Sequence, residues 1–263
     1  MNAPMITLRT RVFHLALIAL AGLGIAAPAS AQQTLKVLTA GAFKQVVVAL
    51  VPALEAKTGM KVEIDNDTAG ALVRKVQAGE PFDVLVLPPN GLAALGKEGL
   101  VDAGSIKPVA RVGIGVAVKA GSPRPALATV EQFKEAVLRA RKVAYIDPAS
   151  GGSSGIYLSG LFERLGIAAD VRAKAVLVPG GLVAERLVSG EADLAIHQVS
   201  EILPVRGVEL VGMLPEGIQN YTTYAAGISA KSRYADAARV LLQVLTSPEA
   251  VEVIRAKGMT PAP

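Results

Sequence analysis

Residues Leu35–Leu87 read LKVLTAGAFKQVVVALVPALEAKTGMKVEIDNDTAGALVRKVQAGEPFDVLVL and alternate between two hydrophobic patterns. Three short segments have the pattern of strands: Leu35–Thr39 and Asp83–Leu87 are mostly apolar, and Lys61–Asp65 alternates polar and apolar residues. Between them, apolar residues recur at helical spacing over residues 43–54 and 72–76, and Gly59 follows the first run as a helix stop. The order strand, helix, strand, helix, strand predicts a parallel sheet covered by helices.

The rest of the chain predicts a second α/β unit rather than the continuation of one barrel. Thr129 and Gln132 make a capping box that opens a helix ending near Arg141. Further strands are predicted at residues 111–119, 143–146, 174–178, 193–196 and 208–213, and further helices at residues 156–165 and 182–188. After the polar segment Gln219–Tyr224, two helices finish the chain, and Ser247 caps the second.

The first residues have the pattern of a secretory leader. Arg9 and Arg11 precede the apolar run Val12–Ile25, and Ala29-Ser30-Ala31 provides the small residues of a cleavage site. The apolar run is shorter than the roughly 20 residues that a bilayer span needs. We therefore expect a signal peptide over residues 1–31, cleavage after Ala31, a periplasmic location and no membrane insertion of the mature chain.

Composition excludes several classes of function. The 263 residues are 51% hydrophobic and 19% charged, which excludes a disordered chain, and the absence of cysteine excludes thiolate catalysis and iron–sulfur clusters. The net charge is +5, but lysine and arginine are scattered and aromatic residues are few, so no nucleic acid partner is expected. A basic surface instead favours small anions. No metal or other cofactor is expected, since Asp65–Gly70 only imitates the start of a calcium loop.

The segment Asp147–Gly155, DPASGGSSG, joins a predicted strand to a predicted helix and is the strongest candidate for a binding site. Glycines allow backbone amides to turn inward, serines add hydroxyl donors, and a helix start adds unpaired N–H groups with a positive dipole end. These are the groups that hold an anion without a lysine. The alternative is an ordinary capped loop.

Similar turns follow other predicted strands, at Thr39–Ala42, at Thr68–Gly70 and at Pro179–Gly181. Ligands of open α/β sheets bind beyond the carboxyl ends of strands, so turns from two α/β units predict one cleft between them. The predicted ligand-binding residues are Gly41, Ala42, Phe43, Thr68, Ala69, Gly70, Ser150, Gly152, Ser153, Ser154, Gly180, Gly181, His197, Gln198 and Tyr221.

His197 is the only histidine that follows the predicted leader. It comes directly after a predicted strand, so we expect it to face the cleft, as a ligand contact, a proton carrier or a structural residue. Tyr221 and Tyr224 could bring hydroxyls to the same cleft or pack at a hinge.

Several motifs together resemble the periplasmic molybdate-binding-protein-like family of solute receptors, which has the type II periplasmic binding fold. They are Val37–Phe43, Thr68–Leu72 with Gly79–Asp83, Asp147-Pro148 ahead of Gly155–Tyr157, Gly190–Asp193 and Ser247–Glu249. The resemblance implies an α/β fold of two lobes, each a mixed, mostly parallel sheet flanked by helices, with crossings near Val112 and Tyr224. One lobe is expected to comprise residues 32–112 and 225–263, and the other residues 113–224. The resemblance also implies a monomer that delivers a small anion to an ABC-type transporter.

The chain departs from the molybdate receptors at positions that contact the oxyanion. Ala42 stands where they carry a serine, Thr68-Ala69 where they carry two serines, and Gln198 where a tyrosine touches the anion. A tetrahedral oxyanion would lack donors here, and desolvating it without them is costly. The departures favour a larger polycarboxylate over molybdate.

The same family includes an aconitate isomerase branch, and resemblance to it implies a second hypothesis. The reaction would remove a proton from an allylic carbon and return it at another, without a cofactor. The implied roles are His197 as proton carrier, Tyr221 as a second proton donor, and Ser153, Ser154 and Thr68 as carboxylate anchors. The sequence leaves both hypotheses open: a solute-binding protein and an isomerase of cis- and trans-aconitate.

Overall fold

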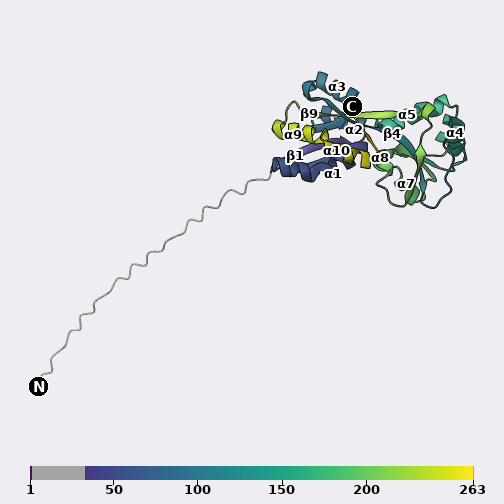
Figure 1. The fold of residues 1–263 in the computed structure, drawn as a ribbon, viewed down its shortest axis with the longest axis horizontal. Coiled ribbons are helices and arrows are strands. Elements are labelled where there is room, and N and C mark those ends of the chain that lie inside the picture. The colour runs from purple at the N-terminus through teal and green to yellow at the C-terminus, as the bar shows by residue number, and fades with distance from the viewer. Residues whose placement is uncertain (2–32, 263) are drawn as a thin grey trace. The chain divides into compact units, whose positions relative to one another are not determined.

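The computed structural model describes Met1 and residues 33–262 (Figure 1). The predicted leader beyond Met1, with its cleavage site after Ala31, lies outside the described residues. None of the helices in the described part of the chain has the length and hydropathy of a membrane span.

The first five elements follow the predicted order. They are β1 (Thr34–Ala40), α1 (Gly41–Thr58), β2 (Lys61–Asp67), α2 (Ala69–Gln77) and β3 (Val84–Leu87). β1 pairs in parallel with β2 on one side and with β3 on the other, which confirms the predicted parallel sheet. α1 ends at Gly59, whose φ of 68° is the left-handed conformation that glycine adopts most readily.

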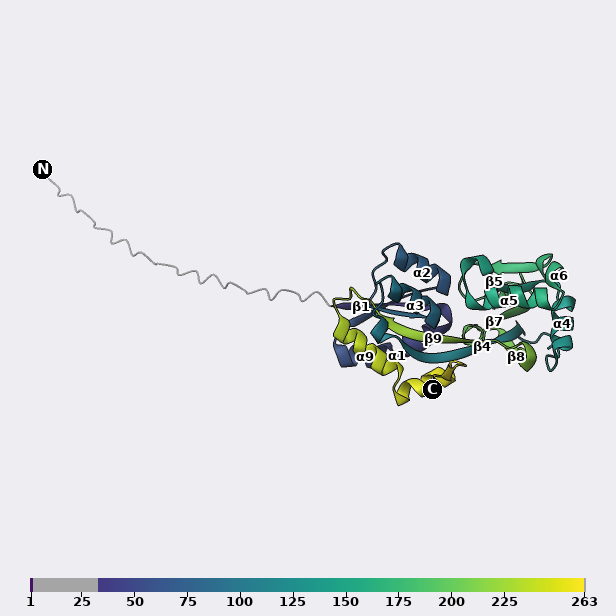
Figure 2. The same ribbon diagram turned by 90° about the horizontal axis from the view of Figure 1, so that it is seen from above.

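One long strand, β4 (Lys107–Lys119), joins the two halves of the sheet (Figure 2). Its first part, Lys107–Gly113, pairs with β9 (Tyr221–Ile228), and from Ile114 onward it pairs with β7 (Leu194–Gln198). The sheet order is β2-β1-β3-β9-β4-β7-β5-β6, with β8 (Val208–Met213) and β10 (Thr260–Pro261) also paired to β4. β4 therefore changes partners between Gly113 and Ile114, directly opposite the start of β9.

The second half of the molecule contains β5, β6, β7 and β8 with their helices. The remaining elements there are α4 (Val130–Arg139), β5 (Val143–Ile146), α5 (Ser153–Arg164), α6 (Ala168–Arg172), β6 (Ala175–Val178), α7 (Glu185–Val188) and α8 (Val199–Ile202). The capping box of Thr129 and Gln132 is confirmed at the start of α4. The predicted loop Asp147–Gly155 is shorter than expected, because Pro148–Ser150 form a 3₁₀ turn and α5 begins at Ser153.

Two further differences concern lengths and missed elements. The helix predicted over residues 182–188 begins only at Glu185, and the polar crossing predicted at Gln219–Tyr224 is in part strand β9, which the sequence analysis missed. α3 (Pro89–Lys97) and α6 were also missed. α3 begins directly after Pro88, with Pro89 at its first position, where a missing N–H costs nothing.

The two closing helices cover the first half of the sheet. α9 (Ala235–Leu245) packs against α1 and β9, and α10 (Pro248–Ala256) packs against α1 (Figure 2). The Ser247 hydroxyl accepts a hydrogen bond from the Ala250 amide, so the predicted cap is confirmed. Buried residues of this half form one hydrophobic cluster, and those of the second half form two.

Gly155 lets α5 start directly against the end of β5. A Cβ at this position would overlap the carbonyl oxygen of Ile146, a backbone atom that has no freedom to rotate away. We expect Gly155→Ala to lower the free energy of unfolding by about 1–3 kcal/mol, the usual cost of overpacking. Urea unfolding followed by circular dichroism measures this effect.

Gly160→Ala in the same helix is the matched control. The nearest atom to a Cβ there is the flexible guanidinium of Arg164, at 3.5 Å. Because alanine forms helix better than glycine, this variant should gain about 0.5–1 kcal/mol. Equal destabilisation by the two variants would show that the close approach of Gly155 to the Ile146 carbonyl does not determine the loss of stability.

Candidate functional site

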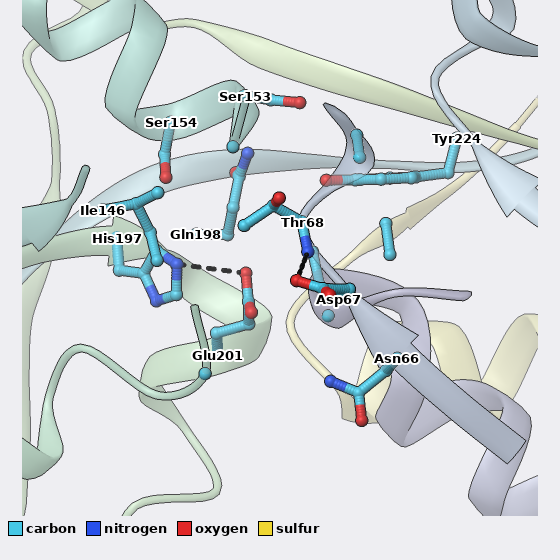
Figure 3. A pocket seen from close by; sticks show the side chains of 16 residues that line it. Asn66, Asp67, Thr68, Ile146, Ser153, Ser154, His197, Gln198, Glu201 and Tyr224 are labelled. Atoms are coloured by element: carbon cyan, nitrogen blue, oxygen red, sulfur yellow. Dashed lines mark hydrogen bonds and ion pairs between the residues drawn. The ribbon is translucent and has the colours of Figure 1, made fainter. Parts of the chain in front are cut away.

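A cavity lies where the carboxyl ends of β1, β2, β5 and β7 meet (Figure 3). Ten of the residues predicted to bind ligand line it: Gly41, Ala42, Thr68, Ala69, Gly152, Ser153, Ser154, Gly181, His197 and Gln198. The four strand-to-helix corners singled out in the sequence therefore meet at one place. Their role in binding stays a prediction.

Five predicted residues do not line this cavity: Phe43, Gly70, Ser150, Gly180 and Tyr221. Phe43 is fully buried, and its ring stacks on Tyr224 with centroids 6.4 Å apart. Tyr221 is 51% exposed, and the Arg111 guanidinium lies 5.1 Å from its ring centroid. The expectation that Tyr221 donates a proton inside the cleft was therefore wrong for this conformation, because β9 directs its side chain elsewhere.

Tyr224, three residues further along β9, is the tyrosine that lines the cavity. Its phenol is buried, and burial raises its pKa; the nearby Glu201 also raises it, while a hydrogen bond with Ser153 opposes the shift. The phenol therefore stays protonated and keeps a hydroxyl beside Ser153 in the cavity (Figure 3).

Two helices begin at the cavity without a side-chain cap. α1 follows Ala40 and α5 follows Gly152. Neither of these residues has a side chain that accepts a hydrogen bond from the first amides of its helix. The first amides of an uncapped helix lack intrahelical partners and carry the positive end of the helix dipole. No lysine or arginine is among the described residues that line the cavity. The donors that line the cavity are therefore amides and hydroxyls, and that they hold an anion stays a prediction.

Thr68 uses its hydroxyl in another way than predicted. The hydroxyl donates to the Ser150 carbonyl at 2.7 Å and accepts from the Ala71 amide at 3.2 Å, as the cap of α2. Its proton is therefore not available to a carboxylate in this conformation. Thr68 instead ties its turn to the loop before α5.

The same two segments touch along their backbones. The Gly70 amide donates to the Gly151 carbonyl at 3.0 Å, and the Arg74 guanidinium donates to the Ser150 carbonyl at 3.2 Å. A Cβ on Gly70 would lie 2.8 Å from the Gly151 Cα, which is too close for any side chain. The turn after β2 and the loop after β5 can approach this closely only because both positions are glycine.

The sequence analysis missed Glu201, which lies in α8 four residues after His197. Its Oε2 is 3.2 Å from His197 Nε2, and both side chains are buried at the edge of the cavity (Figure 3). Gly41 makes room for this carboxyl, since a Cβ there would lie 2.5 Å from Glu201 Oε1. The sequence does place the Glu201 carboxylate four residues after His197, which lies at the end of a predicted strand. The helix α8 that brings the two together has only four residues, too few for a recognisable hydrophobic pattern.

Burial keeps both members of this pair uncharged. It raises the pKa of Glu201 to about 8 and lowers the pKa of His197 to about 3. Although the distance would suit an ion pair, the contact joins two neutral groups between about pH 3 and pH 8, because burial disfavours the charged form of each. A neutral carboxyl also avoids repelling an anion in the cavity.

The raised pKa of Glu201 predicts a pH-dependent stability. Folding favours its protonated form, so this stabilisation is complete below the unfolded pKa of 4.5 and is lost as the pH rises through about 8. His197 has the opposite effect, confined to pH values below its ordinary 6.5. Between pH 6.5 and 8 we therefore expect the free energy of unfolding to fall by about 2 kcal/mol.

Urea unfolding at several pH values tests this expectation. Glu201→Gln should remove the decline above pH 6.5, whereas Glu163→Gln, which changes an exposed carboxylate paired with Arg172, should keep it. An unchanged decline in the Glu201 variant would assign the pH dependence to other groups.

Two residues that line the cavity carry buried polar atoms without a hydrogen-bond partner in the described structure. Gln198 donates from Nε2 to the Thr222 hydroxyl at 2.9 Å, and its Oε1 has no partner in the described structure. His197 Nδ1 is likewise buried without a partner there. Within the described residues, no cluster of three or more His, Asp or Glu side chains is arranged to hold a metal ion.

Comparisons with known proteins fit this geometry. An aconitate isomerase of Pseudomonas sp is 34% identical over 236 residues, which cover 88% of each chain. The Azotobacter vinelandii periplasmic molybdate-binding protein is 22% identical, with a TM-score of 0.72 over 87% of this chain and 99% of that one. The sulfate-binding protein SubI of Mycobacterium tuberculosis is 18% identical, with a TM-score of 0.71 over 88% of each chain. These two structures have the same periplasmic binding protein fold.

The family model described as bacterial extracellular solute-binding protein matches residues 35–260, nearly all of the described chain. The fold, the corners that meet at one cavity and this match lead to the same conclusion. The chain belongs to the family of bacterial extracellular solute-binding proteins.

Proposed function

We propose that this protein binds an unsaturated tricarboxylate in the cavity and isomerises it by moving a proton, as in the interconversion of cis- and trans-aconitate. The observation that carries the proposal is the buried pair of Glu201 and His197, 3.2 Å apart at the edge of an anion-type site. Binding alone needs no acid/base pair, and burying one costs free energy. The relative named aconitate isomerase supports the same reaction.

The residues divide into groups that hold the substrate and groups that move the proton. The uncapped amides of α1 and α5 and the hydroxyls of Ser153 and Ser154 would bind carboxylates. Ala42 and Ala69 have small side chains and leave room for a substrate larger than a tetrahedral oxyanion. A half-turn of the Gln198 amide would present its NH₂ group as one more donor.

The reaction needs one proton and no co-reactant. Glu201, in its ionised form, takes a proton from the allylic carbon, and the electron pair of that C–H bond delocalises over the double bond and an attached carboxylate. Glu201 then returns the proton to the other end of the allylic system, so the double bond has moved and the atoms balance. His197 holds the carboxylate through Nε2–H. A pKa of about 8 makes Glu201 a strong enough base that is still partly ionised at neutral pH.

The alternative is a receptor that captures a polycarboxylate and delivers it to an ABC-type transporter from the periplasm. Membership of the solute-binding family and the anion-binding names of its structural neighbours favour it. In either case we propose a monomer of two lobes, one of residues 32–112 with 225–263 and the other of residues 113–224. The lobes would close on the ligand by bending at two segments, where β4 changes partners and where β9 begins.

Thermal shift with a panel of anions tests the ligand class. We expect cis- and trans-aconitate to raise the melting temperature more than dicarboxylates, and molybdate and sulfate to have little effect. Strong stabilisation by molybdate with none by the carboxylates would contradict the proposed ligand. Aconitate that binds and stays unchanged would leave the receptor as the function.

A further inference from the structure

A second cavity adjoins the first. Gly41, Asn66, Gly181 and Glu201 line both cavities. Glu201 is therefore next to two spaces. The first would hold the substrate, and the second, which we call the rear chamber, is also lined by Lys44, Gln45 and Ser200.

The rear chamber has the chemistry of a water site. The Ser200 hydroxyl is buried, and the described protein atoms offer it no hydrogen-bond partner. A buried hydroxyl without a partner costs about 1–3 kcal/mol, so such groups are normally satisfied by internal water. An ammonium, two carboxamides and a carboxyl also line the chamber, and they give a water molecule the several partners that it needs.

A third cavity continues from the rear chamber toward the surface. Gln45 and Ser200 line both, and the third is completed by Leu203, Pro204, Ala256 and Lys257. Leu203, Pro204 and Ala256 are exposed, so this cavity reaches solvent between α8 and the end of α10. Shared lining residues thus make the three cavities neighbours in a row, with Glu201 between the first two and exposed residues at the third.

We propose that the rear chamber and the third cavity hold water and carry protons between Glu201 and solvent while the substrate occupies the first cavity. The inference rests on the proposed function. When Glu201 holds the proton taken from the substrate, its O–H bond breaks, the proton passes to a chamber water, and that water chain returns a solvent proton to the same carboxylate. Charge and composition are unchanged, but the proton delivered to the product comes from solvent.

A crystal structure at high resolution tests the chamber without reference to activity. We expect ordered water hydrogen-bonded to Ser200 Oγ and to the Glu201 carboxyl from the chamber side. A dry chamber would overturn the inference, even if the protein isomerises aconitate. Ordered water in a protein that leaves aconitate unchanged would contradict the proposed function only.

Isomerisation of trans-aconitate in D₂O tests the transfer itself. We expect wild-type product to carry deuterium at the newly protonated carbon. Ser200→Val replaces the hydroxyl with two methyl groups that cannot hydrogen-bond to chamber water, and deuterium in its product should fall several-fold, by more than the rate of isomerisation falls. Ser159→Val, at a serine of α5 that lines none of the three cavities, should behave as wild type. Wild-type product without deuterium, or equal deuterium in the two variants, would overturn the inference; the crystal structure decides if Ser200→Val does not fold.

Discussion

Glu201→Gln is expected to lower the turnover of aconitate by about 10²- to 10⁴-fold, the usual contribution of a general base. The glutamine amide has nearly the same shape as the glutamate carboxyl. It is also neutral, as the Glu201 carboxyl is at pH values below its raised pKa of about 8. It cannot accept the substrate proton. The dissociation constant for aconitate should therefore change little while kcat falls.

The pH dependence of the wild-type enzyme gives an independent check on the same residue. Since kcat/KM follows the ionised fraction of the free base, it should rise with pH, reach half of its maximum near pH 8 and level off above that value. Steady-state kinetics and calorimetric binding measure both quantities, with Glu163→Gln as the control at an exposed carboxylate. Retained turnover in Glu201→Gln would remove Glu201 from the reaction and leave His197 as the proton carrier that the sequence suggested.

Gly70→Ala is expected to weaken aconitate binding by about 10- to 100-fold, since it would separate contacts that contribute about 1 kcal/mol each. The added Cβ would meet the Gly151 Cα at 2.8 Å, so the turn after β2 and the loop after β5 must move apart. Their parting would break the bond from the Gly70 amide to the Gly151 carbonyl and move the start of α5 away from α1. The anion would then lose one of its two sets of amides.

Gly91→Ala is the control for this substitution. Gly91 lies in α3, and a Cβ there would make ordinary contacts at 3.5 Å with Leu87 and Val73. Both substitutions place alanine in a helix, where it is favoured over glycine, so helix stability does not explain a difference between them. Titration calorimetry measures the affinities. Equal affinities in the two variants would show that the contact of Gly70 with Gly151 does not help to form the binding site.

The convergence of the site could be predicted because it follows from sheet geometry. β1 and β2 run parallel, so the turns after them lie at one edge of the first half of the sheet, and β5 and β7 run parallel, so the loop before α5 lies beside His197 and Gln198 in the second half. The recognition of two α/β units predicted that these two edges face one cleft. Glycine and serine at these corners indicated an anion site from the sequence alone.

What the sequence could not give depends on single side chains and on short elements. Glu201 lies in a four-residue helix with no periodicity of its own, and its importance comes from burial beside His197. The alternation of exposed and buried residues along β9 decides that Tyr224 faces the cavity and Tyr221 does not. The Thr68 hydroxyl could donate a hydrogen bond to a ligand. Only the structure shows that it already donates to the Ser150 carbonyl.

Proton NMR of trans-aconitate incubated with the purified protein tests whether this solute-binding fold holds a proton-transfer site. We expect cis-aconitate signals to grow to a constant ratio with those of trans-aconitate, and Glu201→Gln to form cis-aconitate orders of magnitude more slowly. A spectrum in which trans-aconitate remains unconverted under conditions where calorimetry detects its binding would contradict the account.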